Sequence, residues 1–78
     1  MAVNAYILIE VEPGKTKAAF NAISKIAGVK SAHAVTGPYD IIALCEAADL
    51  KGCGDLVVSK IRAVDGVTKT LTCVAIEI

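Results

Sequence analysis

The spacing of apolar residues changes several times along the chain, and each spacing predicts one element of secondary structure. Residues 4–12 are rich in β-branched side chains and end at Pro13 and Gly14, a pattern typical of a strand that stops at a turn. From Lys15 to Ala27 the apolar residues recur at helical steps, and Gly28 follows as a C-terminal stop. The chain is therefore predicted to begin with a strand and a helix.

Two shorter apolar runs follow and predict a pair of strands. Residues 29–36 alternate loosely, Gly37 and Pro38 interrupt them, and residues 40–47 resume the run. Runs joined by such a short break are typical of neighbouring antiparallel strands. Residues 67–78 form a further alternating stretch, which predicts the last strand.

A second helix is predicted between the third and the last strand. Asp49 is a good N-cap, and an apolar stripe follows it at steps of three and four residues. The stripe consists of Leu50, Cys53, Val57, Ile61 and Val64. Gly52 and Gly54 weaken the first turns by up to about 1 kcal/mol each relative to alanine. The sequence therefore implies either close packing or local flexibility at these two glycines.

The resulting order is strand, helix, strand, strand, helix, strand. This order is the split βαβ arrangement, so we predict an α+β fold of the ferredoxin-like βαββαβ sandwich class. A chain of 78 residues has room for a single domain, which would span residues 1–78. In a lone domain of this fold the helices cover one face of the sheet, and the other face meets water and should be polar.

Both faces of the predicted sheet are instead apolar at their centres. The first strand alternates between a set that contains Ile7 and Ile9 and a set that contains Tyr6 and Leu8, and the third strand repeats the pattern. The last strand carries a set that is also too aliphatic for full exposure, namely Thr70, Thr72, Val74, Ile76 and Ile78. Exposed apolar patches mark interfaces, and small domains gain burial by association. We therefore expect a homo-oligomer built on face-to-face sheet dimers, the dimeric α+β barrel type.

Composition and charge narrow the functional classes. Eight basic and eight acidic residues give a formal net charge of zero, which provides no field to attract nucleic acid or anionic lipid, so neither is an expected partner. No secretory signal and no apolar stretch near the ~18 residues of a membrane span is found, which favours the cytoplasm. Cys45, Cys53 and Cys73 lack C-x-x-C spacing and are interpreted as reduced core residues.

The sequence contains no catalytic signature. Nucleophile motifs, phosphate loops, metal-ligand spacings and dinucleotide fingerprints are all missing, so we expect no enzyme activity, no metal and no cofactor. His33 is the only histidine and has no carboxylate near it in sequence, which favours a structural role. Lys60 and Arg62 are interpreted as part of a solvated helix face.

The segment from Thr36 to Asp40 is the most distinctive in the chain. Gly37 would let a ligand approach the backbone, and Tyr39 offers a flat wall with a polar tip. Asp40 is able to accept hydrogen bonds from a ligand ammonium. The alternative is a plain hairpin turn in which Asp40 binds nearby backbone amides, and the residues alone slightly favour this alternative.

Three threonines on the last strand form a weaker candidate. Thr68, Thr70 and Thr72 are expected on one face of that strand, where their hydroxyls would bind a carboxylate or line a wet pocket. Threonine is also an ordinary strand residue, so this interpretation gains weight only if the strand end lies near Asp40.

Several stretches of the chain match one known family. They are Ala5-Tyr6-Ile7-Leu8-Ile9 before Glu12-Pro13-Gly14, then Gly28-Val29, Thr36-Gly37-Pro38-Tyr39-Asp40-Ile41, Asp49-Leu50 and Gly66-Val67-Thr68-Lys69-Thr70-Leu71-Thr72. With them the chain resembles, over nearly its whole length, the effector-binding domain of the Lrp/AsnC family of transcription regulators. The resemblance implies a βαββαβ domain that dimerises through its sheets, assembles four dimers into an octamer and binds amino acids between neighbouring dimers.

The resemblance also implies a site and a biological setting. The expected amino-acid pocket consists of Gly37, Tyr39, Asp40, Thr70 and Thr72, completed by another subunit. This expectation reverses the preference for a plain turn. Full-length regulators of the family carry an N-terminal helix-turn-helix domain, whereas only Met1 to Asn4 precede the first strand here. We therefore expect a stand-alone regulatory module that modulates a full-length Lrp/AsnC regulator by mixed assembly.

Two other functions stay open at this point. One is a small dimeric α+β barrel enzyme of the oxygenase or isomerase type, which would need His33 or Tyr6 inside a cavity. The other is a purely structural assembly domain that binds no ligand.

Overall fold

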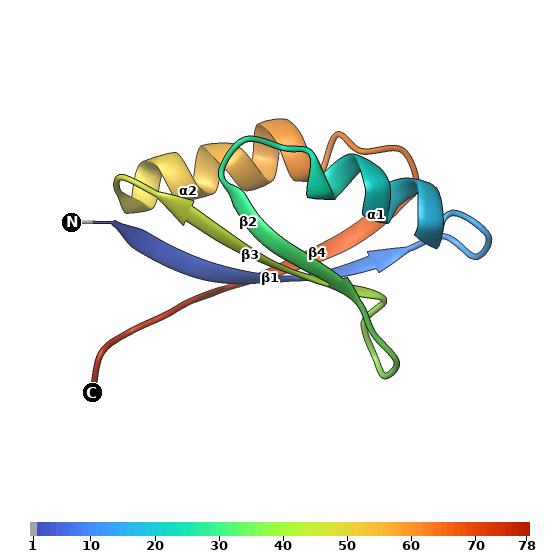
Figure 1. Cartoon of the computed structure of the whole chain (residues 1–78), viewed down its shortest axis with the longest axis horizontal. Coiled ribbons are helices and arrows are strands. Elements are labelled where there is room, and N and C mark those ends of the chain that lie inside the picture. The colour runs from blue at the N-terminus through green and yellow to red at the C-terminus, as the bar shows by residue number, and fades with distance from the viewer. Residues whose placement is uncertain (1) are drawn as a thin grey trace.

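The computed structural model describes residues 2–78, which form a four-stranded antiparallel sheet with helices on one face (Figure 1). The elements are β1 (Val3–Val11), α1 (Thr16–Ser24), β2 (Val29–Ala34), β3 (Ile41–Ala47), α2 (Leu50–Leu56), η1 (Val57–Ile61) and β4 (Val67–Val74). Segment η1 is a π-helix that continues α2. The predicted α+β, ferredoxin-like βαββαβ order is confirmed.

The order of strands in the sheet is β2-β3-β1-β4. Strands β2 and β4 are therefore the edges, and β1 pairs antiparallel with β3 on one side and with β4 on the other. Figure 1 shows α1 and α2 lying across the same face of the sheet. The opposite face, called the open face below, carries no helix of the described residues. None of the described helices is long and apolar enough to cross a membrane.

The hydrophobic core lies between the sheet and the helices. Burial alternates along β1 and β3 because the two-residue period of a strand turns every second side chain toward the helices. The buried residues are Ala5, Ile7, Ile9, Val11, Ala19, Ile23, Ile41, Ala43, Cys45, Cys53, Val57 and Ile61. The predicted division of the first and third strands into two faces is therefore confirmed.

The other residues of these strands form two apolar rows across the open face. Cross-strand pairing aligns Leu71, Leu8 and Ile42 in one row, and Cys73, Tyr6 and Leu44 in the other. The rows are only partly covered within one chain, since Tyr6 is 48% exposed and Leu71 is 45% exposed. The apolar second face that the sequence predicts is therefore present and lacks a cover within residues 2–78.

The last strand supplies different residues to the open face from those expected. Leu71 and Cys73 lie there, while Thr70, Thr72 and Val74 lie opposite residues of β1 that face the helices. The strand also ends at Val74 rather than at residue 78. Cys73 is exposed, so its assignment as a core residue is wrong, because no helix covers this face. Cys45 and Cys53 are buried as predicted.

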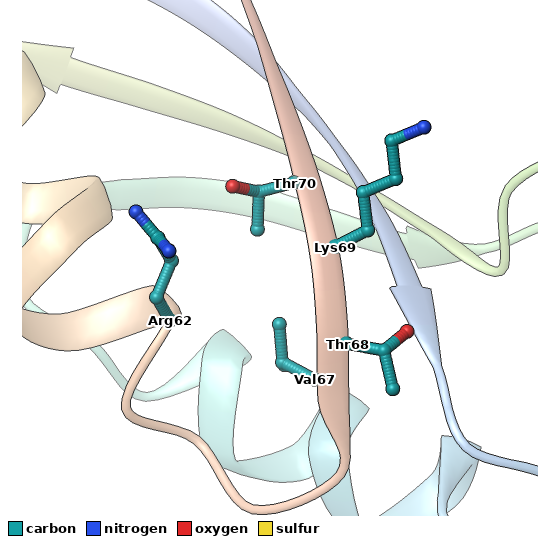
Figure 2. Close-up of a pocket in the computed structure, with 5 residues that line it drawn as sticks. All are labelled: Arg62, Val67, Thr68, Lys69 and Thr70. Carbon is teal, nitrogen blue, oxygen red and sulfur yellow. The ribbon is translucent and has the colours of Figure 1, made fainter.

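A β-bulge near the start of β4 changes which side chains share a face. Glu10 pairs with Lys69 but Val11 pairs with Val67, so Thr68 is an extra residue with no partner on β1. Figure 2 shows the Thr68 side chain on the opposite side of the ribbon from Val67. The expectation that the three threonines of β4 share one face is therefore wrong, since the extra residue breaks the two-residue alternation.

Helix α2 begins at the predicted cap. The Asp49 side chain accepts a hydrogen bond of 2.7 Å from the Gly52 N–H. Leu50 was expected in the buried stripe, but it is 63% exposed, because it is the first helical residue and lies one turn before Cys53, where burial begins. Helix α1 is likewise shorter than predicted, and Gly28 at φ +98° reverses the chain after it.

The two glycines of α2 differ in their surroundings. A Cβ on Gly52 would lie 3.1 Å from Asp49 Oδ1, inside the cap. A Cβ on Gly54 would have nothing within 4 Å. Close packing therefore accounts for Gly52 and gives no reason for Gly54.

Candidate ligand site at the C-terminal end of β1

The distinctive turn forms the loop between β2 and β3. In Figure 1 this loop extends beyond the sheet on the side away from the helices. Gly37 has φ +129°, a conformation that favours glycine, and a Cβ there would meet nothing within 4 Å. Tyr39 and Asp40 are half-buried. The loop therefore presents open backbone at Gly37 next to a phenol and a carboxylate.

Asp40 is fixed by backbone hydrogen bonds on both sides of its Cα. Its N–H donates to the Ile9 carbonyl at 2.9 Å, and its Oδ2 accepts from the Val11 N–H at 2.9 Å. Its carbonyl accepts from the Val35 N–H, also at 2.9 Å, which closes the loop. The Asp40 carboxylate thus binds a backbone amide of β1, 29 positions away in the sequence, and not an amide of its own turn. Oδ1 has no hydrogen bond from residues 2–78, so one carboxylate oxygen is free to accept from a ligand.

The predicted threonines lie on the other side of β1 from this loop. Ile9 pairs with Ile41 of β3 and with Thr70 of β4, so β1 separates Thr70 from the residue next to Asp40. Two strand spacings correspond to about 10 Å between the Cα atoms. One chain therefore places the two halves of the predicted pocket apart, with the turn on one side of β1 and Thr70 and Thr72 on the other.

A hollow of ≈ 360 Å³ lies beside the first residues of β4. Its lining residues are Arg62, Val67, Thr68, Lys69 and Thr70. Figure 2 shows Arg62, Val67 and Thr70 directed to the same space between η1 and β4, whereas the Lys69 side chain points to the other side of the strand. The volume falls within the range of about 300–1,000 Å³ that small-molecule sites occupy. Thr70 is the predicted site residue that borders this hollow.

Arg62 was not recognised as a site residue from the sequence. Its neighbour Lys60 and the helical position favoured a solvated face, and Arg62 is indeed exposed. The overlooked signal is its place one turn before the strand that carries the threonines. Among residues 2–78 the Arg62 guanidinium has no carboxylate partner, whereas Lys15 has two and Lys30 and Lys51 have one each.

The remaining ionisable groups have structural surroundings. Lys15 binds Asp65 at 3.0 Å, and this hydrogen bond and charge, with Glu12 nearby, raise the pKa of Lys15. Burial raises the pKa of the Cys45 thiol to about 11, and the neighbouring Cys53 adds to the effect, so Cys45 stays protonated and is a poor nucleophile at neutral pH. Residues 2–78 contain no cluster of three or more histidine, cysteine or acidic side chains that would hold a metal ion.

Comparison with known proteins identifies relatives along nearly the whole chain. The family model of the Lrp/AsnC ligand binding domain matches residues 4–78. The chain is 36% identical over 78 residues to an uncharacterized HTH-type transcriptional regulator of Pyrococcus furiosus, and this match covers 96% of the chain and 52% of the regulator. The chain thus spans about half the length of that relative.

Solved structures share the fold. A crystal structure of the Thermus thermophilus protein TTHA0845 matches with a TM-score of 0.92 at 32% identity, and covers 97% of this chain and 95% of its own. A transcriptional regulator of Neisseria meningitidis, crystallised as a complex with L-Met, matches with a TM-score of 0.85 at 18% identity, over 96% of this chain and 50% of its own. At that identity the second likeness concerns the fold alone. The family match over residues 4–78 shows that the chain belongs to the Lrp/AsnC ligand binding domain family.

Proposed function

We propose that this chain is an amino-acid-binding regulatory module that works as a homo-oligomer. The observation that carries the proposal is the open face of the sheet, where two apolar rows span β4, β1 and β3 without a helix to cover them. Neighbouring apolar rows on one uncovered face of a sheet are typical of an interface. A second copy placed face to face would remove these rows from water and add the burial that a small domain needs.

The borders of the open face fit this role. Lys69 and Glu10 pair across β4 and β1 beyond one apolar row, and Lys30 binds Glu46 at 3.1 Å beyond the other. An apolar centre with a charged rim is the usual anatomy of a protein interface. The charges at both ends would limit sliding of one sheet over the other.

The amino-acid site is proposed to form between copies of the chain. Gly37, Tyr39 and Asp40 lie on one side of β1, and Thr70 and Thr72 lie on the other, so the strand stands between the two groups within one chain. If the turn of one copy meets the start of β4 from another copy, the turn residues and the threonines of the proposed pocket face each other. The site would then exist only in the assembled protein, and higher assembly such as an octamer of four dimers would follow from it.

The class of ligand is inferred from the family and from the chemistry of the turn. The family is one of ligand-binding domains, and the N. meningitidis regulator of the same fold was crystallised with L-Met. In this chain the free Oδ1 of Asp40 is suited to an ammonium group, and the open backbone at Gly37 gives room for it. We propose a free amino acid as the effector, and mixed assembly with a full-length Lrp/AsnC regulator in the cytoplasm as the route to transcription.

We propose no catalytic role. Tyr6 and His33, which the enzyme alternative would need inside a cavity, both belong to the open face. The cross-strand neighbours of Tyr6 are Leu44 and Cys73, so no carboxylate or imidazole stands directly beside its phenol. A carboxylate or imidazole beside the phenol would help to tune it as a general acid or base.

Assembly through the open face is tested by placing a charge on it. Leu71→Glu would bury a carboxylate against the partner sheet, so we expect its mass in solution, measured by light scattering after size exclusion, to fall below that of the wild type. Val58→Glu is the matched control, because Val58 is also an exposed aliphatic residue but lies on η1, away from this face. A wild-type chain that is monomeric at all concentrations, or equal masses for the two variants, would rule out this interface.

Ligand binding is tested by calorimetry and thermal shift with each of the common amino acids. A ligand that binds the folded assembly raises its melting temperature. We expect at least one amino acid to do so, and we expect Leu71→Glu to lose the effect along with the assembly. If no amino acid binds or shifts the wild type, the sensing role is wrong and a purely structural assembly domain remains.

A further inference from the structure

The hollow beside β4 is bordered by the Arg62 guanidinium, with which no carboxylate of residues 2–78 forms an ion pair. Arg62 is the C-cap of η1, and its N–H donates to the Val57 carbonyl at 2.9 Å, which fixes the backbone at this point. Its guanidinium is directed to the same space as the Thr70 side chain (Figure 2) and has no carboxylate partner among residues 2–78. Arginine stays charged at any working pH and offers a planar fork of donors that suits a carboxylate.

The edge of β4 adds donors to the same place. Ala75 donates its N–H to the Asn4 carbonyl, so Asn4 and Ala75 form a hydrogen-bonded pair. In an antiparallel ladder such pairs alternate, which leaves the N–H of Thr70 directed away from β1 and out of the sheet. Thr70 and Arg62 border the same hollow, and the Thr70 hydroxyl, its N–H and the Arg62 guanidinium are all hydrogen-bond donors.

The residues expected from the family resemblance lack a positive charge. Gly37, Tyr39, Asp40, Thr70 and Thr72 include one carboxylate and no cation. An amino acid carries a carboxylate as well as an ammonium group, and an anion removed from water needs charged or multiple donors to offset its desolvation. Arg62 is the cation that borders the hollow on the same side of β4 as Thr70.

We propose that Arg62 and Thr70 form the carboxylate subsite of the effector pocket at the start of β4. This inference rests on the proposed amino-acid site and deepens it. Arg62 of one copy holds the carboxylate of the amino acid, while Asp40 from the turn of another copy receives the ammonium group. The ligand is thereby oriented by opposite charges contributed by two chains.

The test compares Arg62→Gln with the matched variant Lys60→Gln. Both remove one positive charge from exposed positions two residues apart, but Lys60 does not border the hollow. For the amino acid that binds the wild type most tightly, calorimetry should show a loss in affinity of about tenfold or more for Arg62→Gln and little change for Lys60→Gln. The carboxamide of the same amino acid, which lacks the anion, should bind weakly and equally to the wild type and to Arg62→Gln.

The outcomes separate this inference from the proposed function. If the wild type binds an amino acid and Arg62→Gln binds it equally well, the subsite is wrong and the sensing function stands. If no amino acid binds the wild type, the sensing function fails, and the subsite is tested with sodium propionate in ¹H–¹⁵N spectra. A shift of the Arg62 Nε–H in the wild type, together with a shift of the Thr70 amide that disappears in Arg62→Gln, would retain a carboxylate site, and unchanged wild-type spectra would overturn it.

Discussion

The carboxylate of Asp40 accepts a hydrogen bond of 2.9 Å from the backbone N–H of Val11, a residue 29 positions away in the sequence. Together with the bond from the Asp40 N–H to the Ile9 carbonyl, this contact extends the pairing of β1 and β3 by one side chain beyond the last paired residues. A residue expected to bind a ligand thus also holds the end of the central strand. Its replacement should affect stability as well as binding.

We expect Asp40→Ala to lower the free energy of unfolding by about 1–2 kcal/mol, because the Val11 N–H would lose its charged acceptor in a half-buried position. Asp40→Asn keeps a side-chain oxygen in the same place and should lose less. Urea denaturation of the three proteins at one concentration measures the difference. A stability of Asp40→Ala equal to that of the wild type would show that this hydrogen bond contributes nothing.

Gly54→Ala should stabilise the protein by about 0.5–1 kcal/mol, since the glycine is helical and an added Cβ meets nothing within 4 Å. Gly52→Ala is the comparison, because its Cβ would press on Asp49 Oδ1 and disturb the cap of α2. Thermal or urea unfolding should therefore rank Gly54→Ala above the wild type and above Gly52→Ala. The reverse order would mean that Gly54 has a role that the isolated chain does not reveal.

Cys73 provides a probe of the open face that needs no change in sequence. It is exposed in one chain and lies in an apolar row next to Tyr6, so a face-to-face dimer would cover it. We expect a thiol reagent to modify Cys73 slowly in concentrated protein and faster on dilution or in Leu71→Glu. Cys45 and Cys53 should react only on unfolding, because both are buried. A rate at Cys73 that does not depend on protein concentration would argue against the dimer.

The free energy of unfolding should fall in alkaline solution because the Cys45 thiol ionises there. Burial raises the pKa of its thiol from 9.0 to about 11, so the folded state holds the proton more firmly than the unfolded state does. The resulting stabilisation is fully present below pH 9.0 and is lost as the pH rises through about 11. Cys45→Ala should therefore show a smaller loss of unfolding free energy between these values than the wild type shows. Lys15, whose pKa is also raised, is present in both proteins and cancels in the comparison.

The alternation of apolar residues was sufficient to predict the sheet. On β1 and β3 the two-residue period places Ile7 and Leu8 on opposite faces, and no long-range information is needed for this. Which of the two apolar faces the helices cover is given by the structure. The cap at Asp49 was equally local, because its oxygen binds an N–H three residues later. Features that depend only on residues close together in the sequence can therefore be predicted from the sequence alone.

Features that depend on residues distant in the sequence could not be predicted from the sequence. The bulge at Thr68 exists because Val11 and Glu10 pair across a gap of more than fifty residues, and nothing in the threonine spacing announces it. The exposure of Cys73 depends on where the helices lie. In the sequence Arg62 has the pattern of a solvated helix residue, and only the fold brings it beside the first residues of β4. The ligand set inferred from the turn therefore lacked the cation that the fold brings to the threonine strand.

The bulge has a consequence for how related chains are able to differ in length. Thr68 is the unpaired extra residue between Val67 and Lys69, so its deletion would leave Val67 on the helix side and Lys69 on the open face. An insertion or deletion elsewhere in β4 would instead move every following side chain to the wrong face. A relative that is one residue shorter at this point would begin the strand with less twist and lose the hydrogen bond from the Thr68 hydroxyl to the Glu10 carbonyl. It would still direct Val67 and Thr70 to the hollow, so sequences of unequal length are best aligned with the gap placed here.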